Sequence, residues 1–247
     1  MNVRSLARDG SRRRLPRAPS VTEHAVDKIR ERIVSGAWSA GDRLPKESEL
    51  AAELGISRNS LREAVRALSQ LRVLEVRQGD GTYVSSLEPD LLLESTGFIS
   101  HLLLGETELE LYEVRRILEA AAAALAAGRI DAKEKLDLGQ ILDRMRAAQT
   151  VEELVEADVA FHALVAKAAG NAVLTSLLAS LSTRTMRIRL WHGRAADDAL
   201  DETREEHRRI YEAIIAGDPE LARAVATAHI ASGERWLRTQ LTARNSA

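Results

Sequence analysis

The sequence predicts a mainly α-helical protein, in which a winged helix-turn-helix of three helices and a β-hairpin precedes an all-α antiparallel bundle. Apolar residues recur at the three-to-four-residue spacing of amphipathic helices along most of the 247 residues. A change of period typical of strands is confined to residues 73–84. After residue 91 the helical segments are separated by short loops, which favour antiparallel neighbours.

Length and charge distribution predict two folded domains behind a basic tail. The chain is longer than a usual single domain of about 100–150 residues. Its first 20 residues hold six arginines and one aspartate without periodicity, so we expect a disordered basic tail, either solubilising or in contact with a polyanion. The expected divisions are a tail at 1–20, the winged helix-turn-helix at 21–86, a linker at 87–94 and the helical domain at 95–243.

Composition limits the classes of protein and of site. No apolar run approaches the roughly 20 residues that span a bilayer, and residues 1–20 lack the apolar centre of a secretory signal. We therefore expect a cytoplasmic protein without membrane contact. The chain has no cysteine, which leaves histidine, aspartate and glutamate as strong side-chain ligands for any metal.

The N-terminal elements follow from capping and turn residues as well as from periodicity. Ser57 is a good N-cap for the third helix. Gly79 and Gly81 permit the positive φ that a tight hairpin turn requires. The predicted elements are helices at 23–34, 46–54 and 58–71, and strands at 73–77 and 82–84.

The C-terminal part shows helical segments separated by glycine, proline and aspartate. Its alanine-rich stretch, Ala120–Ala127, is a strong helix former rather than a disordered repeat. The predicted helices are 91–104, 107–127, 131–148, 150–169, 171–192, 197–216 and 219–241.

The third helix carries side chains suited to reading DNA. Its apolar stripe, which includes Leu61 and Leu68, occupies one side. The other side carries Arg58, Asn59, Arg62 and Arg66. Arginine can pair with two acceptors of guanine, and asparagine can do the same with adenine. The simpler interpretation is a solvated face paired with nearby acids. As the second helix of a helix-turn-helix, this face favours contact with the major groove.

Four motifs then stand in order: Gly41–Pro45, Glu47–Ala51, Ile56–Ala64 and Arg77–Val84. Together they resemble the GntR family of bacterial regulators, over residues 21–84. The resemblance implies an operator-binding winged helix, and Ser48 departs from it by replacing an arginine that many members direct at the DNA. The residues assigned to DNA contact are Arg43, Ser57, Arg58, Asn59, Ser60, Arg62, Gln78 and Gly79.

Histidine placement predicts a metal site in the helical domain. Asp158 and His162 are four residues apart on one predicted helix, so their side chains share a face. His207 and His229 lie mid-helix in two further segments joined by a tight turn, which can bring them level. Three imidazoles and a carboxylate suit zinc, with nickel or manganese as alternatives. Spacing alone favours the alternative, because an Asp–His pair four residues apart is more often a surface helix pair than a ligand pair.

A second set of motifs includes Glu113–Glu119, Asp158–His162, Gly170-Asn171 and Glu206–Ile210. It is similar to the all-helical effector (FCD) domain of the FadR subfamily of GntR regulators, over about residues 95–240. The resemblance implies that Asp158, His162, His207 and His229 hold a divalent cation, that a carboxylate effector completes its coordination, and that Arg115 pairs with this effector. The alternative for Arg115 is a salt bridge to Glu113 or Glu119.

We therefore expect a homodimeric, non-enzymatic regulator that binds a pseudo-palindromic operator and releases it when a small carboxylate binds, although activation is also open. Two other classes remain. A metal-dependent hydrolase lacks an HExxH-type general base in this sequence. A ligand-independent architectural DNA binder would use the helical domain only for dimerisation.

Overall fold

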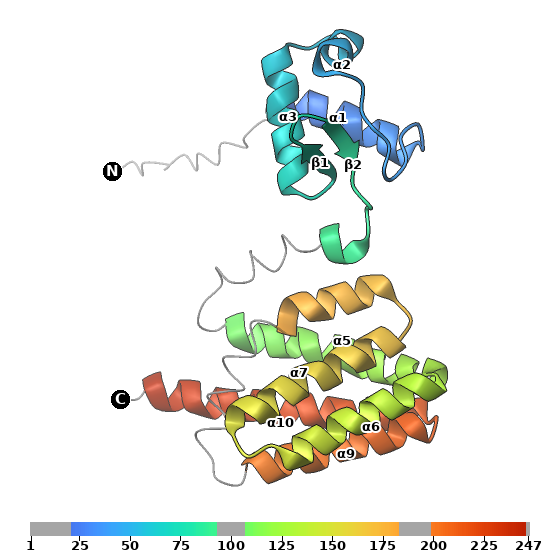
Figure 1. Cartoon of the computed structure of the whole chain (residues 1–247). Helices are drawn as coiled ribbons and strands as arrows, with labels where there is room; N and C mark the ends of the chain where they lie inside the picture. The colour runs from blue at the N-terminus through green and yellow to red at the C-terminus, as the bar shows by residue number, and fades with distance from the viewer. Residues whose placement is uncertain (1–20, 93–106, 183–198, 246–247) are drawn as a thin grey trace, which may run out of the picture. The chain divides into compact units, whose positions relative to one another are not determined.

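The computed structural model describes residues 21–92, 107–182 and 199–245 (Figure 1). The chain divides into two compact units, Met1–Leu87 and Glu88–Ala247, and each unit has its own hydrophobic core. None of the helices in these ranges combines the length and the apolar composition that crossing a bilayer requires.

The first unit is a three-helix fold closed by a hairpin, as the sequence predicts. Ile29, Leu50 and Leu61 are fully buried at its centre, one from each helix. The two strands pair antiparallel from Leu74 opposite Val84 to Arg77 opposite Gly81. Its elements are α1 Val21–Val34, α2 Glu47–Leu54, α3 Arg58–Gln70, β1 Leu74–Arg77 and β2 Gly81–Val84.

Three glycines in this unit serve different purposes. Gly55 ends α2 in the left-handed region, at φ 68°, so that α3 can begin three residues later. In the hairpin, Gly79 has a φ of 78°, but Gly81 does not have a positive φ. A Cβ atom on Gly81 would lie 2.7 Å from Nε of Arg43, so this glycine provides space rather than a turn conformation.

The second unit is a helical bundle, which confirms the predicted fold class. Helix α10 packs along α5 and α9, while α6 and α5 both pack against α7 (Figure 1). Its elements are α5 Thr107–Arg129, α6 Ala132–Ala147, α7 Val151–Ala168, α9 Ala199–Ile215 and α10 Pro219–Asn245, and residues 172–182 are also helical.

Capping residues set several of the helix starts. Capping boxes open α6 at Asp131 and α7 at Thr150. Residues 89–92, which lie inside the expected linker, are helical. Pro89 is the first of them, a position where a backbone N–H would have no partner within the helix, so the N–H that proline lacks is not missed. The predicted helix at 91–104 and the end of that at 171–192 lie largely outside the described residues.

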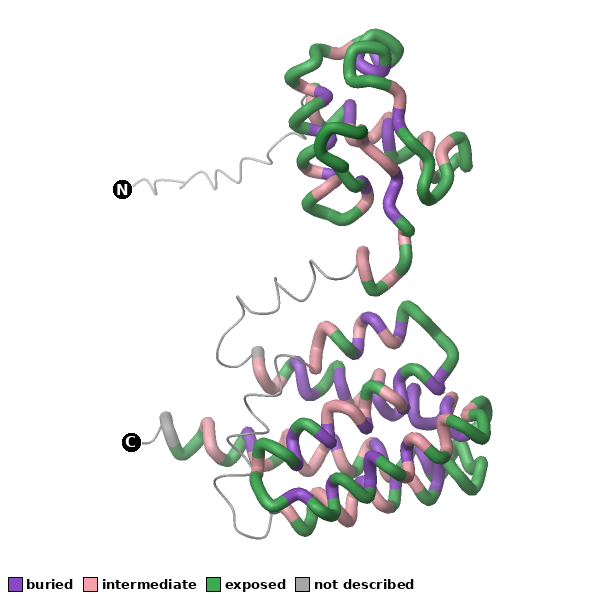
Figure 2. Tube along the Cα trace, viewed as in Figure 1, coloured by how far each residue is buried: buried purple, intermediate pink, exposed green. Residues whose placement is uncertain are grey.

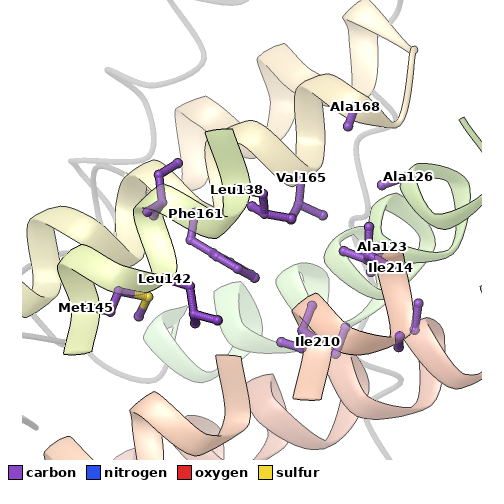
Figure 3. Close-up of a cluster of buried hydrophobic side chains, with 14 of the residues drawn as sticks. Ala123, Ala126, Leu138, Leu142, Met145, Phe161, Val165, Ala168, Ile210 and Ile214 are labelled. Atoms are coloured by element: carbon purple, nitrogen blue, oxygen red, sulfur yellow. The ribbon is translucent and has the colours of Figure 1, made fainter. Parts of the chain in front are cut away.

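The core of the second unit is continuous with a buried polar cluster. Figure 3 shows Phe161, Leu142, Met145 and Ile210 gathered between the helices, and all four are buried. The ring of Phe161 meets that of His207 edge to face, with centroids 4.9 Å apart. The apolar core therefore forms one wall of the site described below.

Candidate DNA interface and metal centre

The exposed face of α3 presents the expected DNA-contacting side chains. Arg58, Asn59 and Arg62 are exposed, whereas Leu61 and Leu68 on the opposite side are buried. This division follows from helical periodicity, because the buried stripe must face the core. The face therefore offers guanidinium and amide groups to a ligand without disturbing the fold.

The two serines at the start of α3 are engaged with each other. Oγ of Ser57 accepts from the backbone N–H of Ser60 at 3.1 Å, and the two hydroxyls lie 2.9 Å apart. Ser57 is thus the N-cap of α3, in agreement with the sequence. A phosphate contact by either hydroxyl would have to share this capping arrangement.

The wing holds the remaining expected DNA contacts. Gln78 and Gly79 are exposed in the turn between the strands. Arg43 reaches this turn, where its guanidinium donates to the backbone carbonyl of Asp80 and lies 3.5 Å from the Asp80 carboxylate. The hydroxyl of Tyr83 donates to the same carboxylate at 2.8 Å. Arg43 therefore helps to hold the wing tip in shape.

Two arrangements on this unit were not predicted from the sequence. The guanidinium of Arg77 lies over the Tyr83 ring, 4.2 Å from its centroid. Nε of Arg62 donates to Oε2 of Glu47 at 2.8 Å, which links α3 to the first residue of α2. Cross-strand register could have indicated the first contact, but the second depends on how α2 crosses α3.

In the second unit, four side chains from three helices meet at one point. Nε2 of His207 lies 2.9 Å from Oδ1 of Asp158, and Nε2 of His162 lies 3.2–3.3 Å from the Nε2 atoms of His229 and His207. One ligand atom from each of the four lies within 4.8 Å of all the others. The structure thus brings the α7 pair Asp158 and His162 together with His207 of α9 and His229 of α10.

The opposite ring nitrogen of each histidine has an acceptor. Nδ1 of His207 donates to the Thr203 carbonyl at 2.7 Å, Nδ1 of His229 lies 2.7 Å from Glu206, and Nδ1 of His162 lies 2.8 Å from Glu119. In a neutral imidazole whose Nδ1 donates in such a contact, Nε2 keeps its lone pair. The three Nε2 atoms point to the place where the rings converge, which is the arrangement that metal-ligating histidines adopt.

Arg115 lies beside this cluster and pairs with Glu119. Nε of Arg115 donates to Oε1 of Glu119 at 2.6 Å, and Arg115 is only 2% exposed. The other carboxylate oxygen of Glu119 is the one near His162. Figure 2 shows how buried and exposed positions alternate along the helices of this unit, and both Arg115 and Glu119 are at buried positions. Glu119 therefore connects the guanidinium to the histidine cluster, a role that was not predicted for it.

Charge and burial act in opposite directions on the histidine pKa values. Burial lowers the pKa of His162, but the carboxylates of Glu119 and Asp158 outweigh it and raise that pKa above its usual value. Burial lowers the pKa of His229 well below normal, and positive charge on His207 and His162 lowers it further. The lowered pKa therefore favours the neutral, ligating form of His229.

A cavity opens on one side of the cluster. Arg115, Asp158 and His229 line it together with Thr203 and Ser232. Its volume, counted for the centre of a water-sized molecule, is about 70 Å³, and one water needs about 10–15 Å³ on this measure. The cavity can therefore admit a small molecule that meets the guanidinium and the cluster together.

Comparison with known families gives two matches. The family described as "Bacterial regulatory proteins, gntR family" matches residues 21–84, and the FCD domain matches residues 110–232. The matches coincide with the hairpin-closed unit and with the helical bundle that contains the cluster.

Individual proteins match over most of their length. The chain is 34% identical to the HTH-type transcriptional regulator LutR of Bacillus subtilis, over 82% of this chain and 94% of that protein. It is 31% identical to the galactonate operon transcriptional repressor of Escherichia coli, over 88% and 96%. Among solved structures, Streptococcus agalactiae GntR has a TM-score of 0.61 at 31% identity, covering 87% of this chain and 99% of that one.

Proposed function

Because the chain belongs to the GntR family of DNA-binding transcription regulators and carries an FCD effector domain, we propose that it is a repressor released from its operator by a small carboxylate bound at a metal site. The families and relatives matched are regulators, not enzymes, and give no support to a hydrolase or an architectural DNA binder. The observation that carries the proposal is the convergence of three Nε2 atoms and one carboxylate oxygen.

The donor set fits a divalent cation. Asp158, His162, His207 and His229 would hold the ion, and neutral imidazoles with a carboxylate favour zinc, with nickel or manganese as alternatives. The contacts at Nδ1 support this fit, since they point the lone pairs at one place and would strengthen each nitrogen as a ligand. A bound ion supplies a positive centre that attracts an anionic ligand.

A carboxylate is the ligand class that the cavity suits. Arg115 lines the cavity, and its planar guanidinium can pair with both oxygens of a carboxylate. Glu119 accepts from Nε of Arg115, which orients the guanidinium beside the cavity. Thr203 and Ser232 add groups that can bond a hydroxyl on the same molecule. The proposed effector is therefore a small, polar organic acid.

The proposed DNA-reading surface combines the exposed face of α3 with the wing. The proposed contacts of α3 with base edges or phosphates of an operator come from Arg58, Asn59 and Arg62. Ser57 and Ser60, near the N-terminus of α3, and Arg43, Gln78 and Gly79, at the wing, complete the proposed surface. We further propose a homodimer on a pseudo-palindromic operator, since symmetric dimers place two such surfaces one helical turn apart. Repression is proposed because one of the relatives is a named operon repressor.

Metal analysis of the purified protein tests the sensing site. We expect one divalent ion per chain in the wild type and less than about a tenth of that in His162→Ala and His207→Ala, because a removed ligand typically costs a large part of the affinity. His24→Ala is the control, since His24 lies on α1 in the other unit. Equal metal content in all four proteins would eliminate the site while leaving the DNA-binding half intact.

A further inference from the structure

A carboxylate stands next to the proposed DNA-reading face of the first unit. Glu47 is the first residue of α2, and its Oε2 accepts from Nε of Arg62 on α3 at 2.8 Å. Both side chains are about half exposed, so the pair lies at the surface where DNA would approach. It connects two helices, unlike the pair between Arg66 and Glu63, which lies within α3 alone.

The contact engages only one edge of the guanidinium. Glu47 accepts from Nε of Arg62, and the two terminal nitrogens, Nη1 and Nη2, form a different edge of the planar group. Those nitrogens form the fork that can pair with O6 and N7 of guanine. A guanidinium held through Nε therefore keeps its base-reading edge available and loses less rotational freedom when it binds.

The negative charge of Glu47 lowers the affinity of this surface for DNA of any sequence. Phosphates dominate nonspecific affinity, and a carboxylate near them opposes binding to any sequence. Orientation of Arg62 benefits only sequences that place an acceptor pair where the guanidinium points. The two effects have opposite signs on nonspecific and specific binding.

We propose that Glu47 is a positioning residue for Arg62, which raises the discrimination between operator and other DNA while lowering affinity for DNA in general. This inference rests on the proposed DNA-reading role of Arg62. It is distinct from an ordinary exposed ion pair, which contributes little to stability and nothing to sequence preference.

The test begins with a duplex selected by the wild-type protein from a randomised DNA pool. Dissociation constants are then measured for this duplex and for a random-sequence duplex, with wild type, Glu47→Gln and Glu53→Gln. Glu53 is the matched control, because it is an exposed acid on the same helix that pairs with Arg32 of α1 at 2.7 Å. Circular dichroism shows whether each variant is folded.

We expect Glu47→Gln to bind the random duplex at least as tightly as wild type and to lose about tenfold in the ratio of specific to nonspecific affinity. Glu53→Gln should keep the wild-type ratio. In an Arg62→Ala background, Glu47→Gln should leave the ratio unchanged, because the residue acts through Arg62. A purely structural role for Glu47 would instead weaken both duplexes together.

Two failures can be told apart. A wild-type protein that enriches no sequence would contradict the proposed function, and this inference with it. A selected duplex whose affinity ratio is the same in Glu47→Gln and wild type would contradict only the role of Glu47.

Discussion

Arg115 and Glu119 place opposite charges one helical turn apart at two buried positions of α5. Nearly complete burial makes this pair costly to form, and removal of one partner leaves the other as an uncompensated charge. The pKa of Arg115 reflects the same balance, since burial lowers it while Glu119 and the ring of Tyr112 raise it, with a net increase. The guanidinium therefore stays charged and available to an anion.

Replacement of Arg115 should be severely destabilising by itself. We expect Arg115→Met to lower the free energy of unfolding of the helical unit by about 3–5 kcal/mol, because Glu119 loses its partner. The double variant with Glu119→Gln should recover part of this loss, since the orphaned charge is then removed. Urea denaturation of the four proteins in the cycle measures the effect. An equal loss in the single and double variants would show that packing, not charge, is responsible.

Metal binding should release a proton from His162. The raised pKa means that this imidazole keeps its proton to a higher pH than an ordinary histidine, and a ligating nitrogen must be unprotonated. Apparent affinity should therefore increase with pH until His162 is neutral, while His229, with its lowered pKa, should contribute little release. Titration calorimetry with Co²⁺, in buffers of different ionisation enthalpy at about pH 6.5 and about pH 8.5, counts the protons. Proton release that does not fall at the higher pH would contradict this assignment.

At the scale of elements, the start of α7 decides where two of the four clustered side chains lie. Oγ1 of Thr150 accepts from the N–H of Glu153, and the Glu153 carboxylate accepts from the N–H of Thr150. Backbone hydrogen bonds from Gln149 and Thr150 are the main reason that the pKa of Glu153 is lowered. Two otherwise unpaired N–H groups are satisfied in this way.

Loss of this cap should cost a small, measurable amount of stability. We expect Thr150→Ala to lower the free energy of unfolding by about 1 kcal/mol, the usual value for an N-cap. Thr227→Ala is the control, because the Thr227 hydroxyl only bonds back to Arg223 within α10 and should matter little. Thermal or urea unfolding gives both values. Similar losses in the two variants would indicate that the cap has no special role.

Local patterns predict the elements better than they predict the contacts between them. Periodicity and caps give the bundle helices nearly their observed bounds, and four-residue spacing places Asp158 and His162 on one face of α7. The groups that orient the histidines could not be predicted in the same way. Thr203 acts through its backbone carbonyl, and Glu119 approaches His162 only because α5 packs against α7.

The whole chain consists of two units with separate cores, so a ligand of one unit need not stabilise the other. The proposed metal ligands all belong to the helical unit. At a free metal concentration of about 100 times the dissociation constant, we expect that unit to gain about 2.7 kcal/mol while the winged helix gains nothing. Scanning calorimetry should show only the helical transition moving to higher temperature. His207→Ala should abolish the shift, and a shift of both transitions would argue against independent units.

The proposed homodimer also makes the two DNA-reading surfaces depend on operator geometry. One dimer can bind two half-sites at once only if both lie on the same face of the duplex. One turn of the duplex takes about 10–10.5 base pairs. We expect an insertion of about five base pairs between the half-sites of a selected operator to weaken binding at least about tenfold, because it rotates one half-site to the opposite face. The insertion leaves every base contact within a half-site unchanged, so the loss would arise from symmetry alone. Gel-shift titration against the parent duplex measures it, and sedimentation equilibrium reports whether the protein is dimeric. Equal affinity for the two duplexes would mean that each chain binds its half-site independently.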